Sequence, residues 1–162
     1  MALKGDRYEG MTDVSFFMND TSAAKGGIAV LSTGGSGVAL DQSKALVTYA
    51  AAASGNVPVG LLLNDMVNID QTRQHINFHK NEVQKGGKVT LLTKGWVVTN
   101  MITGTPAAGN PAYLTDEGKL TPTKSADGGV VATPPVGRFL SSEDEDGYAK
   151  VAIDLPAVPT NY

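Results

Sequence analysis

The clearest strand signal in the chain is the stretch from Val136 to Leu155, VGRFLSSEDEDGYAKVAIDL. In its second half, Ala149, Val151, Ile153 and Leu155 lie on one face and Lys150 and Asp154 on the other, which is the two-residue period of a strand with one buried face. The acidic segment EDEDG separates this half from VGRFLSS and has the composition of a turn. The stretch therefore predicts an antiparallel hairpin.

Similar short strand signals recur along the rest of the chain, with Gly- and Pro-containing turns between them. Examples are GGIAVLST, VPVGLLL and AYLTDEGKLTP, where Asp-Glu-Gly predicts a tight hairpin with Gly in the left-handed conformation. The 162 residues include 19 Gly and 8 Pro, and only 18% are charged, which is typical of a β-rich domain with many turns. We therefore predict a single all-β domain, arranged as a sandwich or barrel.

Two segments leave the local structure open. Helix competes with strand in SKALVTYAAAASG, although Val47, Thr48 and Tyr49 favour strand. Gly95 lies between KVTLLTK and GWVVTNM, where it marks either a hairpin turn or a bulge within one long strand.

Two segments of the chain resemble each other. KGGIAVLSTGG runs from Lys25 to Gly35, and KGGKVTLLTKG runs from Lys85 to Gly95. They are either a duplicated hairpin unit or two independent uses of the same turn residues. A phosphate-binding P-loop requires glycines before a Lys and a helix after it, whereas here Lys comes first and β-formers follow. We predict turns in which at least one Gly of each pair has a positive φ.

Bulk composition excludes several classes of partner. A net charge of -3, a pI near 5.3 and the lack of a Lys/Arg cluster argue against nucleic acid. No apolar run approaches the roughly 20 residues that span a bilayer, and the polar first residues are unlike a signal peptide, so we expect no membrane partner.

We expect no catalytic, cofactor or metal site. The chain has no Cys and no G-x-S-x-G motif. His75 and His79 lack the H-E-x-x-H order of zinc sites, and the acidic residues from Glu143 to Asp146 lack the closing Glu of an EF-hand. Asp65 and Asp70 are two carboxylates of the kind that a glycosidase uses as a pair, but they lie in a polar bend, where Asp usually forms turns.

Several stretches from Val57 to Leu155 resemble the small capsid decoration (cement, or head-stabilising) proteins of tailed bacteriophages. They are PVGLLLNDMVNID, VQKGGKVTLLTKGWVVTN, GTPAAGNPAYLTDEGKLT and VGRFLSSEDEDGYAKVAIDL. The resemblance implies a compact β-barrel or β-tulip-like domain without enzymatic activity. It also implies a structural virion protein, made in the host cytoplasm, that binds the outer capsid surface and clamps neighbouring major capsid subunits. The implied partners are the major capsid protein and other copies of the chain, as a homotrimer.

We expect three parts: an extended N-terminal arm at 1–12, the β-barrel-like domain at 13–155, and a loose C-terminal tail at 156–162. The arm has no periodic apolar face, so we expect strands to begin at Asp13 and the arm to become ordered only on a partner. Trp96 is the only Trp of the chain. It fits a place in the core, and it also fits an interface anchor, because Trp is enriched among residues that dominate binding. The candidate interface residues are Leu3, Tyr8, Met11, Phe16, Phe17 and Trp96. The alternative function is a phage fibre or spike domain that binds host carbohydrate.

Overall fold

The computed structural model describes residues 3–20, 22–32, 45–53, 55–63, 82–84, 86–124 and 132–155. These residues form strands, connecting turns and one short 3-10 turn at Asp116–Gly118. The predicted all-β class is therefore confirmed. The predicted features at Asp65, Asp70, His75 and His79, and in the tail at 156–162, lie outside the described residues.

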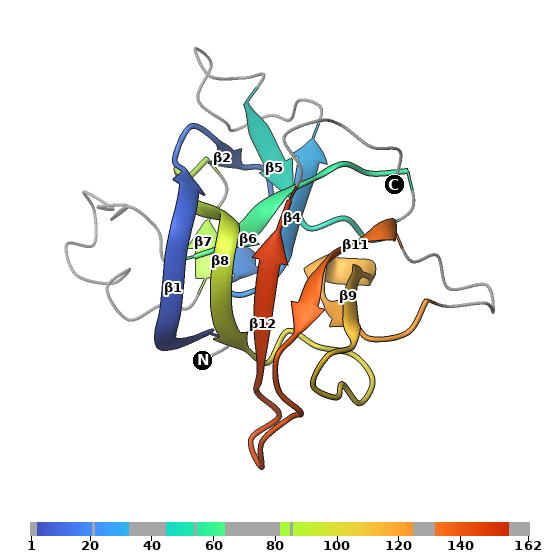
Figure 1. Ribbon diagram of the computed structural model, residues 1–162. Helices are drawn as coiled ribbons and strands as arrows, with labels where there is room; N and C mark the ends of the chain where they lie inside the picture. Colours follow the sequence, from blue (N-terminus) through green and yellow to red (C-terminus); the bar gives the residue numbers. More distant parts are fainter. Residues whose placement is uncertain are drawn as a thin grey trace.

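The strands are short apart from three. In chain order they are β1 (Leu3–Asp13), β2 (Phe17–Met18), β3 (Ser22–Ala24), β4 (Ile28–Ser32), β5 (Leu46–Thr48), β6 (Pro58–Leu62), β7 (Glu82–Gln84), β8 (Leu91–Thr99), β9 (Pro111–Leu114), β10 (Leu120–Thr121), β11 (Ala132–Phe139) and β12 (Ala149–Asp154). Figure 1 shows their arrangement.

Ten of the described strands form one mixed sheet, and β3 pairs with β7 in a second, small sheet. The order in the large sheet is β10-β9-β11-β12-β8-β6-β4-β5-β2, and β1 pairs separately with β8. β1 follows one edge of β8 over its whole length, while β6 and β12 share the other edge. The sheet is open and not closed into a barrel, since it ends in β10 and β2, each only two residues long.

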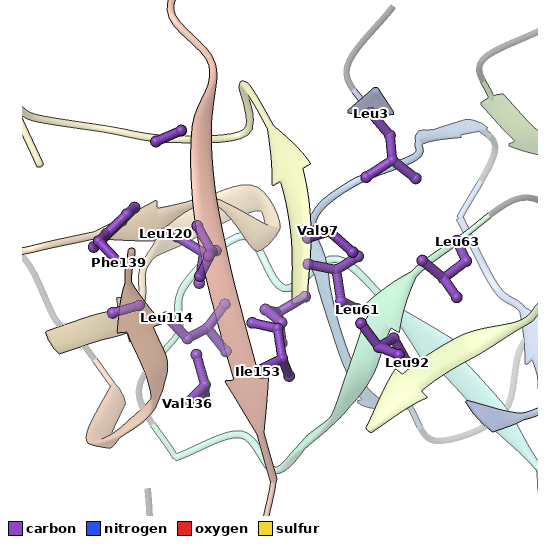
Figure 2. Packing of buried hydrophobic residues seen from close by; sticks show 14 of the residues in the cluster. Leu3, Leu61, Leu63, Leu92, Val97, Leu114, Leu120, Val136, Phe139 and Ile153 are labelled. Carbon is purple, nitrogen blue, oxygen red and sulfur yellow. The ribbon is translucent and has the colours of Figure 1, made fainter. Parts of the chain in front are cut away.

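Two apolar clusters hold the sheet together. The principal core lies under β8, β11 and β12 and continues under β4 and β6 (Figure 2). Its largest fully buried side chains are Ile28, Leu61, Leu63, Leu92, Leu114, Leu120, Phe139 and Ile153.

The second core covers the opposite face of the sheet, but only over part of it. It consists of Met18, Ala23, Ala29, Val47, Leu62, Val89 and Leu91. Successive residues of β6, Leu61 and Leu62, point into different cores. This explains why VPVGLLL is apolar without alternation, since a strand buried on both faces needs no polar side.

The two predicted hairpins are present. In β11 and β12, Gly137 lies opposite Ile153 and Phe139 opposite Val151. The hairpin of β9 and β10 turns through Asp116–Gly118, where Gly118 has φ 76°. A Cβ at Gly118 would lie 2.6 Å from the Tyr49 ring, so close packing reinforces the need for glycine.

Gly26 and Gly86 of the two Gly-Gly pairs lie in turns, as predicted. Gly26 has φ 104° and lies between β3 and β4. Gly86 has φ 80° and lies between β7 and β8. The Tyr49 hydroxyl accepts a hydrogen bond from the Gly27 N–H and donates one to the Ala24 carbonyl. Burial raises the pKa of Tyr49, which keeps this hydroxyl neutral.

The two open segments are both strands. The segment from Leu46 to Thr48 forms β5 and not a helix. Gly95 lies within the single strand β8, with φ 153°. A Cβ at Gly95 would lie 2.0 Å from the carbonyl oxygen of Tyr8, so glycine lets β1 pass against β8.

The expectation that strands begin at Asp13 is wrong. Residues from Leu3 onward form β1, which pairs antiparallel with β8, and Leu3 is buried in the principal core. The segment LKGDRYEGMTD lacks alternation because register shifts interrupt the pairing on both sides of Arg7–Glu9. Its order comes from the β8 backbone, which no local pattern in the segment reveals.

Candidate interaction surface

Along β1, β12 and most of β8, the face of the sheet opposite the principal core is covered by neither core. Residues that lie opposite one another in neighbouring antiparallel strands share a face. Tyr8 of β1 is opposite Trp96 of β8, Trp96 is opposite Ala152 of β12, and Ala152 is opposite Arg138 of β11. The pairs of β8 and β12 around Trp96 alternate with the pairs Gly95–Ile153 and Val97–Val151, in which Ile153, Val97 and Val151 are buried. We call this surface the β1–β8–β12 face.

Two bulges extend the face along β1. Between Glu9 and Met11 the register gains one residue in β1, and between Met11 and Thr12 it gains one in β8. As a result Met11 lies opposite Lys94, and Lys94 lies opposite the exposed Asp154. A bulge of this kind redirects a side chain to the other side of a strand.

Large apolar groups on this face are accessible. Tyr8 is 60% exposed and Met11 is 61% exposed. Of the five exposed large apolar side chains in the described residues, Tyr8, Met11 and Val14 lie on β1 or directly after it. Such a concentration is typical of a surface that binds another protein.

Trp96 belongs to this face and to neither core cluster. Its side chain is half-buried, with the Lys150 ammonium 3.6 Å from the ring centroid. A cation over an indole ring is attracted to its negative face. The structure thus places Trp96 outside the core, where it is available as an anchor.

Around Trp96 the face is basic, although the chain is acidic. Lys94, Arg138 and Lys150 contribute three cations, against the carboxylate of Asp154. Sequence reasoning placed Lys150 and Asp154 on the polar side of their strand. It missed Lys94 and Arg138 as members of the same surface, because that requires the strand order.

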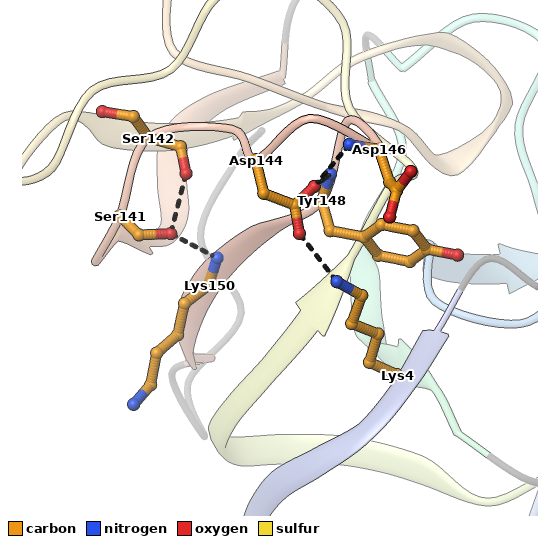
Figure 3. A network of polar contacts seen from close by, with 7 residues as sticks. All are labelled: Lys4, Ser141, Ser142, Asp144, Asp146, Tyr148 and Lys150. Atoms are coloured by element: carbon orange, nitrogen blue, oxygen red, sulfur yellow. Dashed lines mark hydrogen bonds and ion pairs between the residues drawn. The ribbon is translucent and has the colours of Figure 1, made fainter.

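A polar cluster fixes one end of β1 against the β11–β12 hairpin (Figure 3). The Lys4 ammonium lies 2.7 Å from Asp144 Oδ2 and 4.3 Å from the centroid of the Tyr148 ring. Asp144 Oδ1 accepts hydrogen bonds from the backbone N–H groups of Asp146 and Tyr148. Since β8 lies between β1 and β12, this contact joins the strands on its two sides.

The charges of this cluster support each other. The hydrogen bond from Lys4, followed by that from the Tyr148 N–H, holds the pKa of Asp144 below its ordinary value. The same hydrogen bond with Asp144 raises the pKa of Lys4. The acidic hairpin tip predicted from EDEDG therefore supplies one carboxylate that contacts Lys4 of β1.

The other candidate interface residues lie elsewhere. Leu3 packs in the principal core, so its side chain serves the chain's own packing. Phe16 packs against the second core, and Phe17 is half-buried with the Lys88 ammonium 5.7 Å from its ring centroid. The structure thus brings together Tyr8, Met11 and Trp96, but not these three.

In the residues that the structure describes, no three His, Cys, Asp or Glu side chains lie close enough to hold a metal ion. Nor does the described part contain a helix long and apolar enough to cross a membrane.

The chain matches one protein family, described as structural cement protein (E217 gp24/Pam3 gp6), over residues 5–154. No curated protein matches the sequence. The family match confirms the resemblance to capsid decoration proteins and extends it to nearly the whole chain, including most of β1. With the family comes a structural, capsid-stabilising role in the phage virion. The chain belongs to the phage family of structural cement proteins.

Proposed function

We propose that the chain binds the outer surface of the assembled capsid through the β1–β8–β12 face and clamps neighbouring major capsid subunits. The observation that carries this proposal is that β1, β12 and most of β8 pack one face against the principal core. Their other face, which neither core covers, carries Tyr8, Met11 and Trp96. A sheet that is rigid on its buried side presents these groups at low entropic cost. The chain is made in the host cytoplasm and acts as a homotrimer.

Charge specifies the kind of surface that this face recognises. Its three cations favour an acidic patch on the capsid subunits, with Tyr8, Met11 and Trp96 supplying apolar contact. Complementary charge mainly raises the rate and specificity of association, and salt weakens it.

Clamping follows from linkage. A protein that binds the assembled shell but not the free subunits stabilises the shell by its binding free energy. When one trimer contacts two or three subunits, the first contact raises the effective concentration for the others, so that the whole trimer binds more tightly than one copy.

The test is co-sedimentation with phage capsids that lack the protein. The variant Met11→Ser/Lys94→Glu changes two exposed neighbours on the face and should weaken binding at least tenfold, about 1.4 kcal/mol. The control Leu31→Ser removes an apolar side chain that is 47% exposed on β4, away from the face, and should bind normally.

Two results would contradict the proposal. If the Met11→Ser/Lys94→Glu variant binds capsids as tightly as the unaltered chain, another surface makes the contact. If the unaltered chain binds host cells and not capsids, the alternative function as a fibre or spike domain gains support.

A further inference from the structure

Strand β1 is an edge strand in the part of the chain that the structure describes. It pairs with β8 on one side, and within the described residues no other strand pairs with it. An edge strand presents unpaired N–H and C=O groups that can pair with another chain. At 11 residues, β1 is the longest strand of the described sheet, and it carries the exposed Tyr8.

The regular part of β1 is the three-residue stretch Arg7–Glu9, between two register shifts. Tyr8 points to the β1–β8–β12 face because it lies opposite Trp96. Arg7 and Glu9 lie opposite Val97 and Gly95, so both point to the other face, where Arg7 Nε is 2.6 Å from Glu9 Oε1. A cation and an anion thus precede and follow Tyr8 along the edge strand, and both lie on the face opposite to Tyr8.

We propose that the edge of β1 away from β8 pairs antiparallel with β1 of a second copy, about a two-fold axis at Tyr8. An axis perpendicular to the sheet keeps each side chain on its own face, so opposite residues must have numbers of equal parity. With the axis at Tyr8, Arg7 lies opposite Glu9 of the second copy, and Glu9 opposite its Arg7. The two tyrosines then lie opposite each other.

The neighbouring registers are unfavourable. An axis at Arg7 would place two arginines opposite each other, and an axis at Glu9 would do the same for two glutamates, both of which destabilise strand pairing. Charges on an edge strand usually prevent such pairing. Here the order of their signs opposes these two registers and favours the one at Tyr8.

Pairing in this register joins two β1–β8–β12 faces into one. The row Trp96–Tyr8 continues directly into Tyr8–Trp96 of the second copy. A two-fold contact differs from the contacts within a three-fold trimer, so it joins copies of neighbouring trimers. With only three regular residues on each side the contact is weak in dilute solution, and it strengthens when bound copies are held close together.

Single cysteines test the register directly, since the chain has no Cys. In directly opposite residues the Cβ atoms lie about 4.5–5.5 Å apart, so Tyr8→Cys is placed for a disulfide across the axis. Met11→Cys is the control, with the same exposure on the same strand. In the proposed register, residue 11 of the second copy is offset by six residues, about 20 Å.

The experiment uses the purified full chain at high concentration in a glutathione redox buffer, followed by a non-reducing gel. Tyr8→Cys should give at least ten times more covalent dimer than Met11→Cys. Equal yields, or no dimer from Tyr8→Cys, would overturn the proposal.

Mixing of charge variants tests the ion pairs. In the Tyr8→Cys background, Arg7→Glu carries two acidic residues at the axis and Glu9→Arg carries two basic ones. Each alone should lose at least ten times in dimer yield, and an equal mixture should recover it as heterodimer. Because the Arg7–Glu9 pair within one chain cannot be restored by mixing, failure to recover would overturn the proposed register. These outcomes do not depend on capsid binding, so they are distinguishable from failure of the proposed function.

Discussion

The two halves of the sheet differ in how they are covered. Around β4 and β6, side chains on both faces are buried, in the principal core on one side and the second core on the other. Around β1, β12 and the part of β8 from Lys94 onward, only the face toward the principal core is buried in the described residues. Since both halves share the principal core, we infer that folding does not require the uncovered face. That face is free to serve binding.

The largest expected effect on stability is at Leu62, on the face of β6 that the second core covers. Leu62→Ala should lower the free energy of unfolding by about 2–5 kcal/mol, because it leaves a cavity in a closed cluster. Met11→Ala, on the uncovered face, should change it by less than about 0.5 kcal/mol. Chemical denaturation measures both, and equal losses would remove the distinction between the two halves.

A second prediction concerns the contact of β1 with β8. Gly95→Ala should cost about 1–3 kcal/mol, because φ is 153° and the new Cβ would meet the Tyr8 carbonyl. The loss should appear first as faster amide hydrogen exchange in β1. Gly5→Ala adds a Cβ to β1 with no atom within 4 Å, and it should leave the exchange in β1 unchanged. If both variants behave alike, close approach at Gly95 does not hold β1.

The smallest expected effect is the pH dependence of the Lys4–Asp144 contact. The pKa of Asp144 is lowered from 3.8, so its contribution is complete above that pH and is lost as the pH falls through the folded-state value. The pKa of Lys4 is raised from 10.5, so its contribution is lost only as the pH rises beyond that. The Tm difference between the unaltered chain and Lys4→Met should thus be largest between about pH 5 and pH 9.

That Tm difference should shrink below about pH 4, as Asp144 becomes protonated. Lys124→Met removes an exposed lysine outside this contact and should show no such loss. A constant Tm difference from pH 2 to pH 8 would mean that Lys4 does not act through Asp144.

Local patterns predicted the elements that carry their own signal. The alternation from Ala149 to Ile153 revealed β12, and the requirement for positive φ was met at Gly26 and Gly86. β1 was missed because its order depends on Gly95, more than eighty residues away, which admits the Tyr8 backbone. The proximity of Tyr8 to Trp96 likewise depends on register between distant strands.

Binding of this chain to the assembled shell should stabilise the shell. The most direct measurement is the disruption temperature of capsids that lack the protein, by calorimetry, as the purified chain is added. We predict that this temperature rises with concentration and reaches a plateau when the sites are filled. Met11→Ser/Lys94→Glu should require at least tenfold more protein for the same rise. A chain that binds these capsids to saturation without raising their disruption temperature would contradict the account.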